Sequence, residues 1–232
     1  MAVNAFDVRA QLVRGVEVAQ KPSTPPTVFV VDEDWTALTH ISNTLRAQGL
    51  SVRTWRSGAE FLRTYKTQAP GCLVTDPYAA GMSGLDLQRE LLARGIGTPI
   101  VFVAHEVDMR TTVLGMKAGA VTFLAKPIQS AELISAVREA IARDAASRAQ
   151  RREQAAINAR LGQLTPREHQ VLRLLLNGMM TKQIAAELTV GVKTIKVHRG
   201  RILGKMDVPS AMALVALLHR ANVQILGSPL AH

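Results

Sequence analysis

Four ionisable side chains each follow a short apolar run and could act together on an ion: Asp32, Glu33, Asp76 and Lys126. Carboxylate oxygens are the ligands that hard divalent cations such as Mg²⁺ prefer, so the three acids are candidate metal ligands. The ammonium group of a lysine can pair with an anion held beside them. Single charged residues are common on surface loops, so the four indicate a site only if the fold brings them together.

An alternation of strand and helix patterns predicts a fold that would bring these four side chains together. Strands are expected at 28–31, 51–54, 72–75, 99–103 and 121–124. Helices are expected at 36–47, 58–65, 85–94, 109–118 and from 130 onward. Five such units predict a parallel sheet covered by helices on both faces. Ligands of such sheets lie at the carboxyl ends of the strands, where the three acids and the lysine would meet.

This region resembles the receiver domain of two-component response regulators over about residues 27 to 145. The matching stretches are Val-Val-Asp-Glu-Asp (30–34), Leu-Val-Thr-Asp (73–76), Gly-Met-Ser-Gly (81–84), Met-Lys-Ala-Gly-Ala (116–120) and Phe-Leu-Ala-Lys-Pro (123–127). The resemblance implies a flavodoxin-like (βα)5 fold, in which Asp76 accepts a phosphoryl group and Lys126 pairs with it. It also implies Mg²⁺ held by Asp32, Glu33 and Asp76, Phe123 as the switch aromatic, and a sensor histidine kinase as phosphate donor.

Four features of this pocket depart from the family pattern. Glu33 stands where the family has Asp, and its longer side chain fits poorly with the octahedral geometry that Mg²⁺ demands. Ala104 stands where the family has a Thr or Ser hydroxyl that holds the phosphoryl group. The expected Met-Pro pair is Ala79-Ala80, and Pro77 brings no backbone N–H directly after Asp76. We therefore predict phosphorylation that is weak, altered or lost.

A second candidate site is the basic stretch 181–206, which reads as two short helices joined by a turn. The first helix is expected at 182–188 with Thr181 as its cap. Gly191 is expected to supply the unusual backbone of the turn, and the second helix runs from about 192 to 206. Between 193 and 205 there are five Lys or Arg and no acid.

Winding the second helix at 3.6 residues per turn separates two faces. Ile195, Ile202 and Met206 point toward a core, whereas Lys193, Val197, Gly200 and Gly204 point the opposite way, with Lys196 beside them. A helix with an apolar back and a basic front of small residues suits the DNA major groove. The alternative is a surface helix with a solvated charge run.

The stretch before this pair reads as a third helix. Thr165, Pro166 and Glu168 form a capping-box pattern at its start, and Gly178 can end it. The stretches Leu-Thr-Pro-Arg-Glu (164–168), Lys-Gln-Ile-Ala-Ala-Glu-Leu (182–188), Lys-Thr-Ile-Lys-Val-His-Arg (193–199) and Lys-Met (205–206) resemble the LuxR-type helix-turn-helix of NarL/FixJ response regulators. The similarity covers about residues 161 to 224 and implies four helices. The last, at 210–221, would use Leu214, Leu217 and Leu218 in the core or in a dimer contact.

We expect this helix pair to bind duplex DNA. Lys196 and Val197 are predicted to contact base edges, with Lys193 on the same face. Residues predicted to contact the DNA backbone are Lys182, Thr194, His198, Arg199 and Arg201.

Composition limits the other classes of function. The net charge of the 232 residues is +10, and residues 164–220 carry +6 of it, from nine Lys or Arg against three acids. This concentration is typical of a nucleic-acid footprint. Cys72 is the single cysteine, so an internal disulfide is excluded and a reducing, cytoplasmic location is expected. No apolar run approaches the roughly 20 residues of a membrane helix.

The sequence thus predicts a DNA-binding transcription regulator, not an enzyme, with no required cofactor. Its expected parts are an N-terminal extension with a Pro-rich linker (1–26), an atypical receiver (27–145), a solvated helical linker (146–160) and a LuxR-type helix-turn-helix (161–232). Expected partners are duplex DNA, a second copy of the chain and RNA polymerase, and no membrane. The alternatives are a conventional regulator activated by phosphorylation under a sensor histidine kinase, a phosphate sink, and an interaction partner of another regulator.

Overall fold

The computed structural model describes residues 25–65, 69–106, 108–221 and 223, which form two compact units. The division falls between Ala145 and Ala146. The expected N-terminal extension and most of the Pro-rich linker lie outside the described residues. Each unit is described by itself.

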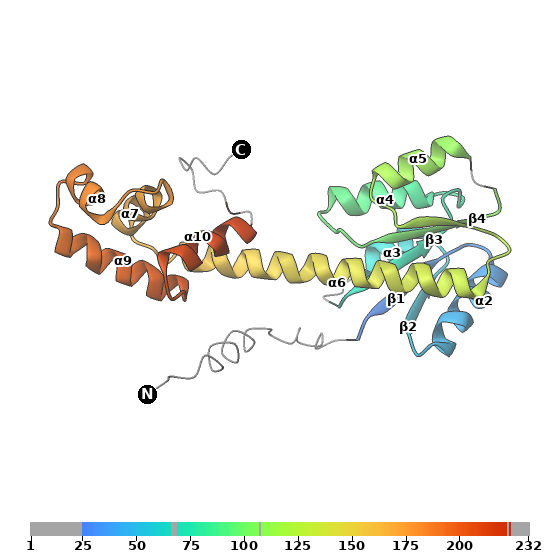
Figure 1. Ribbon diagram of the computed structural model, residues 1–232. Coiled ribbons are helices and arrows are strands. Elements are labelled where there is room, and N and C mark those ends of the chain that lie inside the picture. The colour runs from blue at the N-terminus through green and yellow to red at the C-terminus, as the bar shows by residue number, and fades with distance from the viewer. Residues whose placement is uncertain (1–24, 66–68, 107, 222, 224–232) are drawn as a thin grey trace, which may run out of the picture. The chain divides into compact units, whose positions relative to one another are not determined.

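The N-terminal unit is a five-stranded parallel sheet with helices on both faces (Figure 1). Its strands are β1 (Thr27–Val31), β2 (Ser51–Trp55), β3 (Gly71–Thr75), β4 (Ile100–Ala104) and β5 (Thr122–Ala125). Its helices are α2 (Trp35–Ala47), α3 (Gly58–Thr64), α4 (Gly84–Ala93), α5 (Met109–Lys117) and the first part of α6 (Ser130–Leu161). Every strand and helix predicted for this unit is present, with ends shifted by at most one residue.

The strands lie in the order β2-β1-β3-β4-β5, so the predicted flavodoxin-like fold is confirmed. β3 and β4 are buried at every position, as expected for central strands covered on both faces. One core, with Val30 and Val74, packs under α2 and α6, and the other, with Phe29 and Phe102, packs under α3 and α4. The carboxyl ends of β1, β3, β4 and β5 therefore meet at one edge.

Gly84 is required where α4 begins. Its N–H donates to the carbonyl of Asp76 at 3.0 Å, and a Cβ on Gly84 would lie 2.5 Å from that carbonyl oxygen. The absent side chain lets α4 start directly against the loop that carries Asp76.

The C-terminal unit contains the end of α6 and four shorter helices. These are α7 (Pro166–Leu176), α8 (Thr181–Glu187), α9 (Val192–Met206) and α10 (Ala211–Arg220). The core holds Ile195, Ile202 and Met206, as predicted, together with Leu214 and Leu218 of α10. Within the described residues no single helix is long and apolar enough to cross a membrane, although α9 and α10, bent by 44°, would pass that test together.

Two local predictions are wrong, one in the turn between α8 and α9 and one at the start of α8. Gly191 has an ordinary φ of −67° and forms the N-cap of α9, whereas Thr189 takes the left-handed conformation at φ 52°. Thr181 is the first residue of α8 and not its cap, because Met180 occupies the cap position and its N–H donates to Gln183 Oε1 at 2.7 Å. A single sequence does not reveal which residue will take up the strain of a short turn.

The capping box at the start of α7 is present and has a further partner. Thr165 N–H donates to Glu168 Oε2 at 2.8 Å, and Glu168 N–H donates to Thr165 Oγ1 at 3.3 Å. The same Oε2 accepts from Lys205 Nζ of α9 at 2.6 Å. Lys205 and the Thr165 N–H together lower the pKa of Glu168 from its ordinary 4.5 to about 2, so a buried carboxylate joins α7 to α9.

Glu168 should make the stability of this unit depend on pH. A carboxyl group whose pKa is lower in the folded state stabilises the fold above its unfolded pKa, and this contribution is lost as pH falls toward the folded pKa. The protection factors of the α7 amides, which correct for the intrinsic pH dependence of exchange, should therefore fall as pH is lowered from about 4.5 to 2. Glu168→Gln should exchange faster at neutral pH and lose most of this acid dependence, whereas Glu187→Gln on the exposed side of α8 should behave as the wild type. An unchanged acid profile in Glu168→Gln would contradict the assignment.

Candidate functional site

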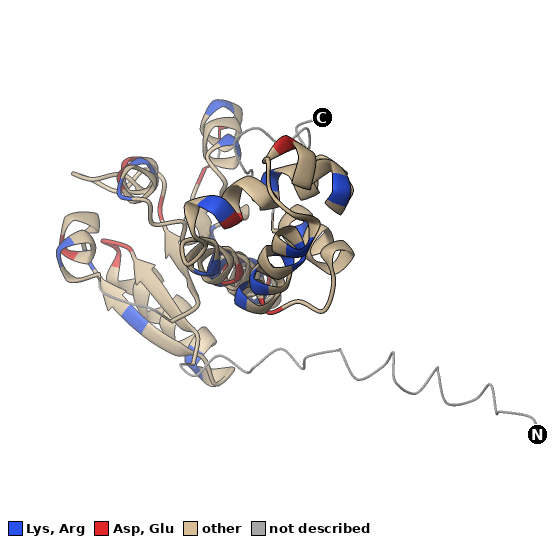
Figure 2. Cartoon of the chain, turned by 90° about the vertical axis from the view of Figure 1, so that its left-hand side faces the viewer, with Lys and Arg blue, Asp and Glu red and all other residues tan. Residues whose placement is uncertain are grey.

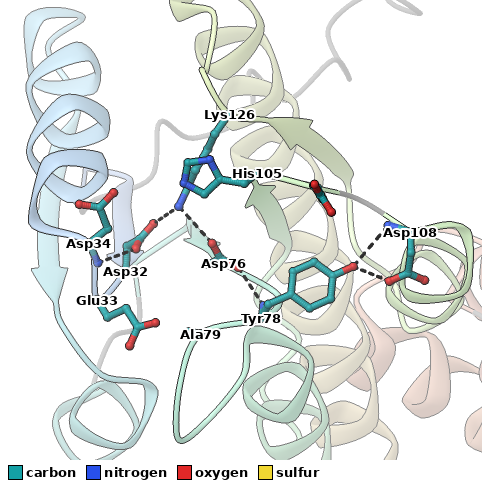
Figure 3. A pocket seen from close by; sticks show the side chains of 10 residues that line it. Asp32, Glu33, Asp34, Asp76, Tyr78, Ala79, His105, Asp108 and Lys126 are labelled. Atoms are coloured by element: carbon teal, nitrogen blue, oxygen red, sulfur yellow. Dashed lines mark hydrogen bonds and ion pairs between the residues drawn. The ribbon is translucent and has the colours of Figure 1, made fainter.

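An open pocket of about 670 Å³ lies at the carboxyl ends of the strands. Among its lining residues are Asp32, Glu33, Asp76 and Lys126, so the structure brings together the four side chains that the sequence singled out (Figure 3). Other lining residues are Asp34, Tyr78, Ala79, His105, Glu106 and Asp108. Acids outnumber cations here, which makes the position of the one lysine decisive.

Lys126 lies between two carboxylates. Its Nζ is 2.8 Å from Asp32 Oδ2 and 3.0 Å from Asp76 Oδ2, and only 7% of its side chain is exposed. Burial lowers the pKa of Lys126, but the hydrogen bonds and charges of Asp32 and Asp76 outweigh it and hold that pKa above its ordinary value. The lysine is therefore charged, and it links the ends of β1, β3 and β5.

Glu33 is turned away from this group (Figure 3). Its Oε1 accepts from the N–H of Ala80 at 3.1 Å, while Asp32 and Asp76 are both directed to Lys126. Carboxylates are suitable ligands for Mg²⁺ in type. Yet the part of the chain that is described holds no group of three or more His, Cys, Asp or Glu able to bind a metal ion. Of the expected magnesium ligands, Asp32 and Asp76 therefore meet at Lys126, and Glu33 is directed elsewhere.

The loop after Asp76 is organised by Tyr78. Pro77 has no N–H to offer, and the Tyr78 N–H donates to Asp76 Oδ1 at 2.8 Å instead. The Tyr78 phenol donates to Asp108 Oδ2 at 2.5 Å and accepts from the Asp108 N–H at 3.3 Å. Asp108 is the N-cap of α5 and accepts from Thr111 N–H at 2.8 Å. The hydrogen bonds from the Tyr78 phenol and the Thr111 N–H lower the pKa of Asp108 to about 2.

The positions expected to sense a phosphoryl group form a compact apolar contact. Ala104 ends β4 fully buried and presents no hydroxyl. Phe123 stacks on Phe102, with ring centroids 4.7 Å apart. A Cβ on Gly115 of α5 would lie 2.6 Å from the Phe123 ring, so Gly115 makes room for that ring. Phe123 and the Gly115 face of α5 are thus packed together by apolar contact.

The second candidate site is the face of α9 that points away from the core. Lys and Arg predominate on the helices of the C-terminal unit (Figure 2). Of the predicted DNA contacts, those that are exposed are Lys182, Lys193, Thr194, Lys196, Val197 and Arg201. Gly200 and Gly204 have open space where a Cβ would be, as a face free to approach a ligand requires.

Two predicted contacts are placed differently. His198 is half-buried, and its buried Nδ1 has no hydrogen-bond partner among the described residues. Arg199 is also half-buried, and its Nη1 donates to Thr181 Oγ1 at the start of α8.

Sequence reasoning missed Tyr78 and Asp108 in the pocket and Arg160 and Arg167 in the C-terminal unit. The Asp-x-x-Thr spacing at Asp108 could have indicated a helix cap, because Asp is favoured there. The pairing of Tyr78 with Asp108 spans 30 residues and has no local signal.

Comparison with known proteins identifies both domains. Residues 28–138 match the response regulator receiver domain, and residues 162–218 match the luxR family of bacterial regulatory proteins. The chain is 38% identical over 204 residues to nodulation protein W of Bradyrhizobium diazoefficiens, covering 88% of this chain and 90% of that protein. It is 37% identical over 193 residues to the response regulator protein TodT of Pseudomonas putida, covering 83% and 85%.

Solved structures agree in fold. The response regulator StyR superposes with a TM-score of 0.77 at 41% identity, covering 85% of this chain and all of that one. Full-length FixJ from B. japonicum gives a TM-score of 0.52 at 30% identity, covering 86% and 98%. The chain belongs to the response regulators that join a receiver domain to a luxR-family DNA-binding domain. It is accordingly a DNA-binding transcription factor and not an enzyme, and its receiver implies a sensor kinase as partner.

The bond between Tyr78 and Asp108 should hold the first turn of α5. Tyr78→Phe removes the phenol oxygen, so we expect the amides of Thr111 and Thr112 to exchange ~3–10-fold faster, as loss of one hydrogen bond predicts. Tyr65→Phe is the matched control, because its phenol pairs with Thr98 and not with Asp108 at the start of α5, and it should leave those amides unchanged. Equal protection of α5 in both variants would rule out the role of Tyr78.

Proposed function

We propose that this regulator binds duplex DNA as a homodimer, acts with RNA polymerase, and is not switched by the usual phosphorylation cycle. The observation that carries the last point is the fully buried Ala104 at the end of β4, which offers no hydroxyl to a phosphoryl group on Asp76. A ligand shifts a conformational equilibrium only as far as it binds the two states differently. Losing one hydrogen bond to a charged group removes about 1.5–3 kcal/mol of such difference.

The surroundings of Asp76 support the same proposal. Phosphoryl transfer depends on cations positioned to neutralise charge on the oxygens. Here Glu33 is bonded to Ala80, and the missing N–H of Pro77 is replaced by the N–H of Tyr78, which Asp76 itself already uses. Binding to DNA needs no cofactor in this account.

In the DNA-binding unit we assign the base contacts to Lys196 and Val197 of α9. Both are exposed beside the bare Gly200 and Gly204, and a basic and an apolar side chain can read a guanine edge and a thymine methyl group. The DNA backbone, contacts to which supply most of the affinity, would be bound by Lys182, Lys193, Thr194 and Arg201.

The dimer would form through exposed apolar side chains. On α5 these include Met109, of which 83% is exposed, and Leu114, of which 53% is exposed. On α10 Met212 is 83% exposed, whereas Leu214 and Leu218 are used in the core. One short reading helix covers too few base pairs for tight specific binding, so two copies would read half-sites about one duplex turn apart.

A conventional phosphorylation-activated regulator is the second candidate. The observation in its favour is the intact group of Asp32, Asp76 and Lys126, with both ion pairs within 3.0 Å. A phosphoryl group on Asp76 would find Lys126 beside it, whatever happens afterwards at Ala104.

Treatment with acetyl phosphate and Mg²⁺ separates the two candidates. We expect little stable label on Asp76 by intact-protein mass and no gain in affinity for DNA, with Asp76→Asn as the unlabelled control. Stoichiometric, Mg²⁺-dependent labelling accompanied by tighter DNA binding would establish the conventional cycle instead.

The matched variant is Ala104→Ser, which returns a hydroxyl to the end of β4. In combination with Glu33→Asp it should restore coupling between phosphorylation and DNA binding, so that acetyl phosphate tightens DNA binding by up to the ~10–100-fold that the lost hydrogen bond represents.

Lys196→Ala should cost about 1–3 kcal/mol of specific DNA binding in every background.

The dimer can be tested by sedimentation of the full-length protein at micromolar concentration with a palindromic duplex. Two chains per duplex are expected. Lysine substitutions at the proposed contacts should lower the number of chains bound per duplex, because a buried unpaired charge is costly. The variants are Met109→Lys with Leu114→Lys on α5, and Met212→Lys on α10. Saturation by one chain per duplex would exclude the dimer.

A further inference from the structure

Eight cations of the DNA-binding unit fall into two groups by burial. Four are half-buried, and each donates to the end of a neighbouring helix: Arg160, Arg167, Arg199 and Lys205. Four others are exposed and make no ion pair or side-chain hydrogen bond within the described part of the chain: Lys182, Lys193, Lys196 and Arg201. Cations of equal formal charge therefore differ in whether they bond a neighbouring helix or remain exposed to solvent.

Arg199 bonds α9, the helix proposed to read the DNA bases, to α8 near the middle of α9. Its Nη1 donates to the hydroxyl of Thr181, the first residue of α8. At 100° per residue, Arg199 lies only about 40° around α9 from Ile195 and about 120° from Lys193. Since Ile195 is fully buried, the guanidinium starts on the side of the helix that faces the core.

The far end of α9 is fastened in the same manner. Lys205 Nζ donates to Glu168 Oε2 at 2.6 Å and to the Gln163 carbonyl at 3.0 Å. Arg160 Nη1 donates to the Met206 carbonyl at 3.1 Å. The other end of α8 is held by Arg167, whose Nη2 donates to the Leu188 carbonyl at 2.8 Å.

We propose that Arg199 is a positioning residue for sequence recognition and not a phosphate contact. Through Thr181 it fixes the angle between α8 and α9, and so it fixes which side chains of α9 meet the base edges. The guanidinium is half-buried and is held at Thr181 on the side of α9 that begins next to the buried Ile195, so it is directed toward α8 and away from the exposed face of α9. Base contacts need accurate placement, whereas attraction to the phosphates does not, so loss of Arg199 reduces specificity more than it reduces overall attraction.

This proposal rests on α9 being the reading helix, and salt titration tests the two separately. Each phosphate contact contributes about 0.9 to the slope of log K against log salt concentration on duplex DNA. Arg201→Met removes an exposed cation of the same helix and should reduce the slope. Arg199→Met keeps much of the apolar stem and should leave the slope unchanged, while the ratio of specific to non-specific affinity falls roughly tenfold.

Thr181→Val supplies an independent variant, because it removes the acceptor and leaves Arg199 in place. It should lower the same affinity ratio, and the double variant Thr181→Val with Arg199→Met should be no worse than the poorer single variant, as expected for residues that act through one bond. Circular dichroism at the assay temperature checks that the full-length variants are folded, and if Arg199→Met is not, Thr181→Val decides.

The outcomes are distinct. A smaller salt slope in Arg199→Met, with Thr181→Val neutral or simply additive, overturns the positioning role and makes Arg199 a phosphate contact. An unchanged slope in Arg201→Met as well shows that α9 does not lie on DNA, which overturns both this proposal and the assignment of the reading face.

Discussion

The buried ammonium group of Lys126 is the constraint on which the receiver depends. It lies within 3.0 Å of Asp32 and Asp76 and so joins the ends of three strands. Two carboxylates at the edge of an apolar core would repel each other, and removing one partner of a buried ion pair leaves a costly uncompensated charge. The acid pocket thus has a structural role that does not depend on phosphoryl chemistry. An intact Asp–Lys group is therefore poor evidence, taken alone, for an intact phosphorylation cycle.

The two units use charge in related ways. In the receiver, Tyr78 bonds Asp76 through its N–H and the N-cap of α5 through its phenol, so the loop that would carry a phosphoryl signal is already tied to α5. In the DNA-binding unit, half-buried cations such as Arg199 and Lys205 bond neighbouring helices, whereas Lys193, Lys196 and Arg201 are exposed. A net charge of +6 over residues 164–220 therefore overstates the charge available to phosphates.

The fold was predictable from the sequence because it follows from local periodicity. The burial of β3 and β4, the capping box at Thr165 and the core face with Ile195 all depend on residue type and spacing within one element. What could not be predicted depends on contacts across long separations or on backbone strain. No pattern marks the partners Arg199 and Thr181, and the left-handed residue of the α8–α9 turn is a threonine although a glycine lies two positions away.

The central claim is that DNA binding by this regulator does not depend on the chemistry of Asp76. Mapping of bound sites across the genome in cells carrying the wild type, Asp76→Asn or Lys196→Ala tests it most directly. Our account predicts that Asp76→Asn occupies the same sites at similar levels as the wild type and that Lys196→Ala loses them. Loss of the sites in Asp76→Asn, with normal amounts of folded protein, would contradict the account and restore control by phosphorylation.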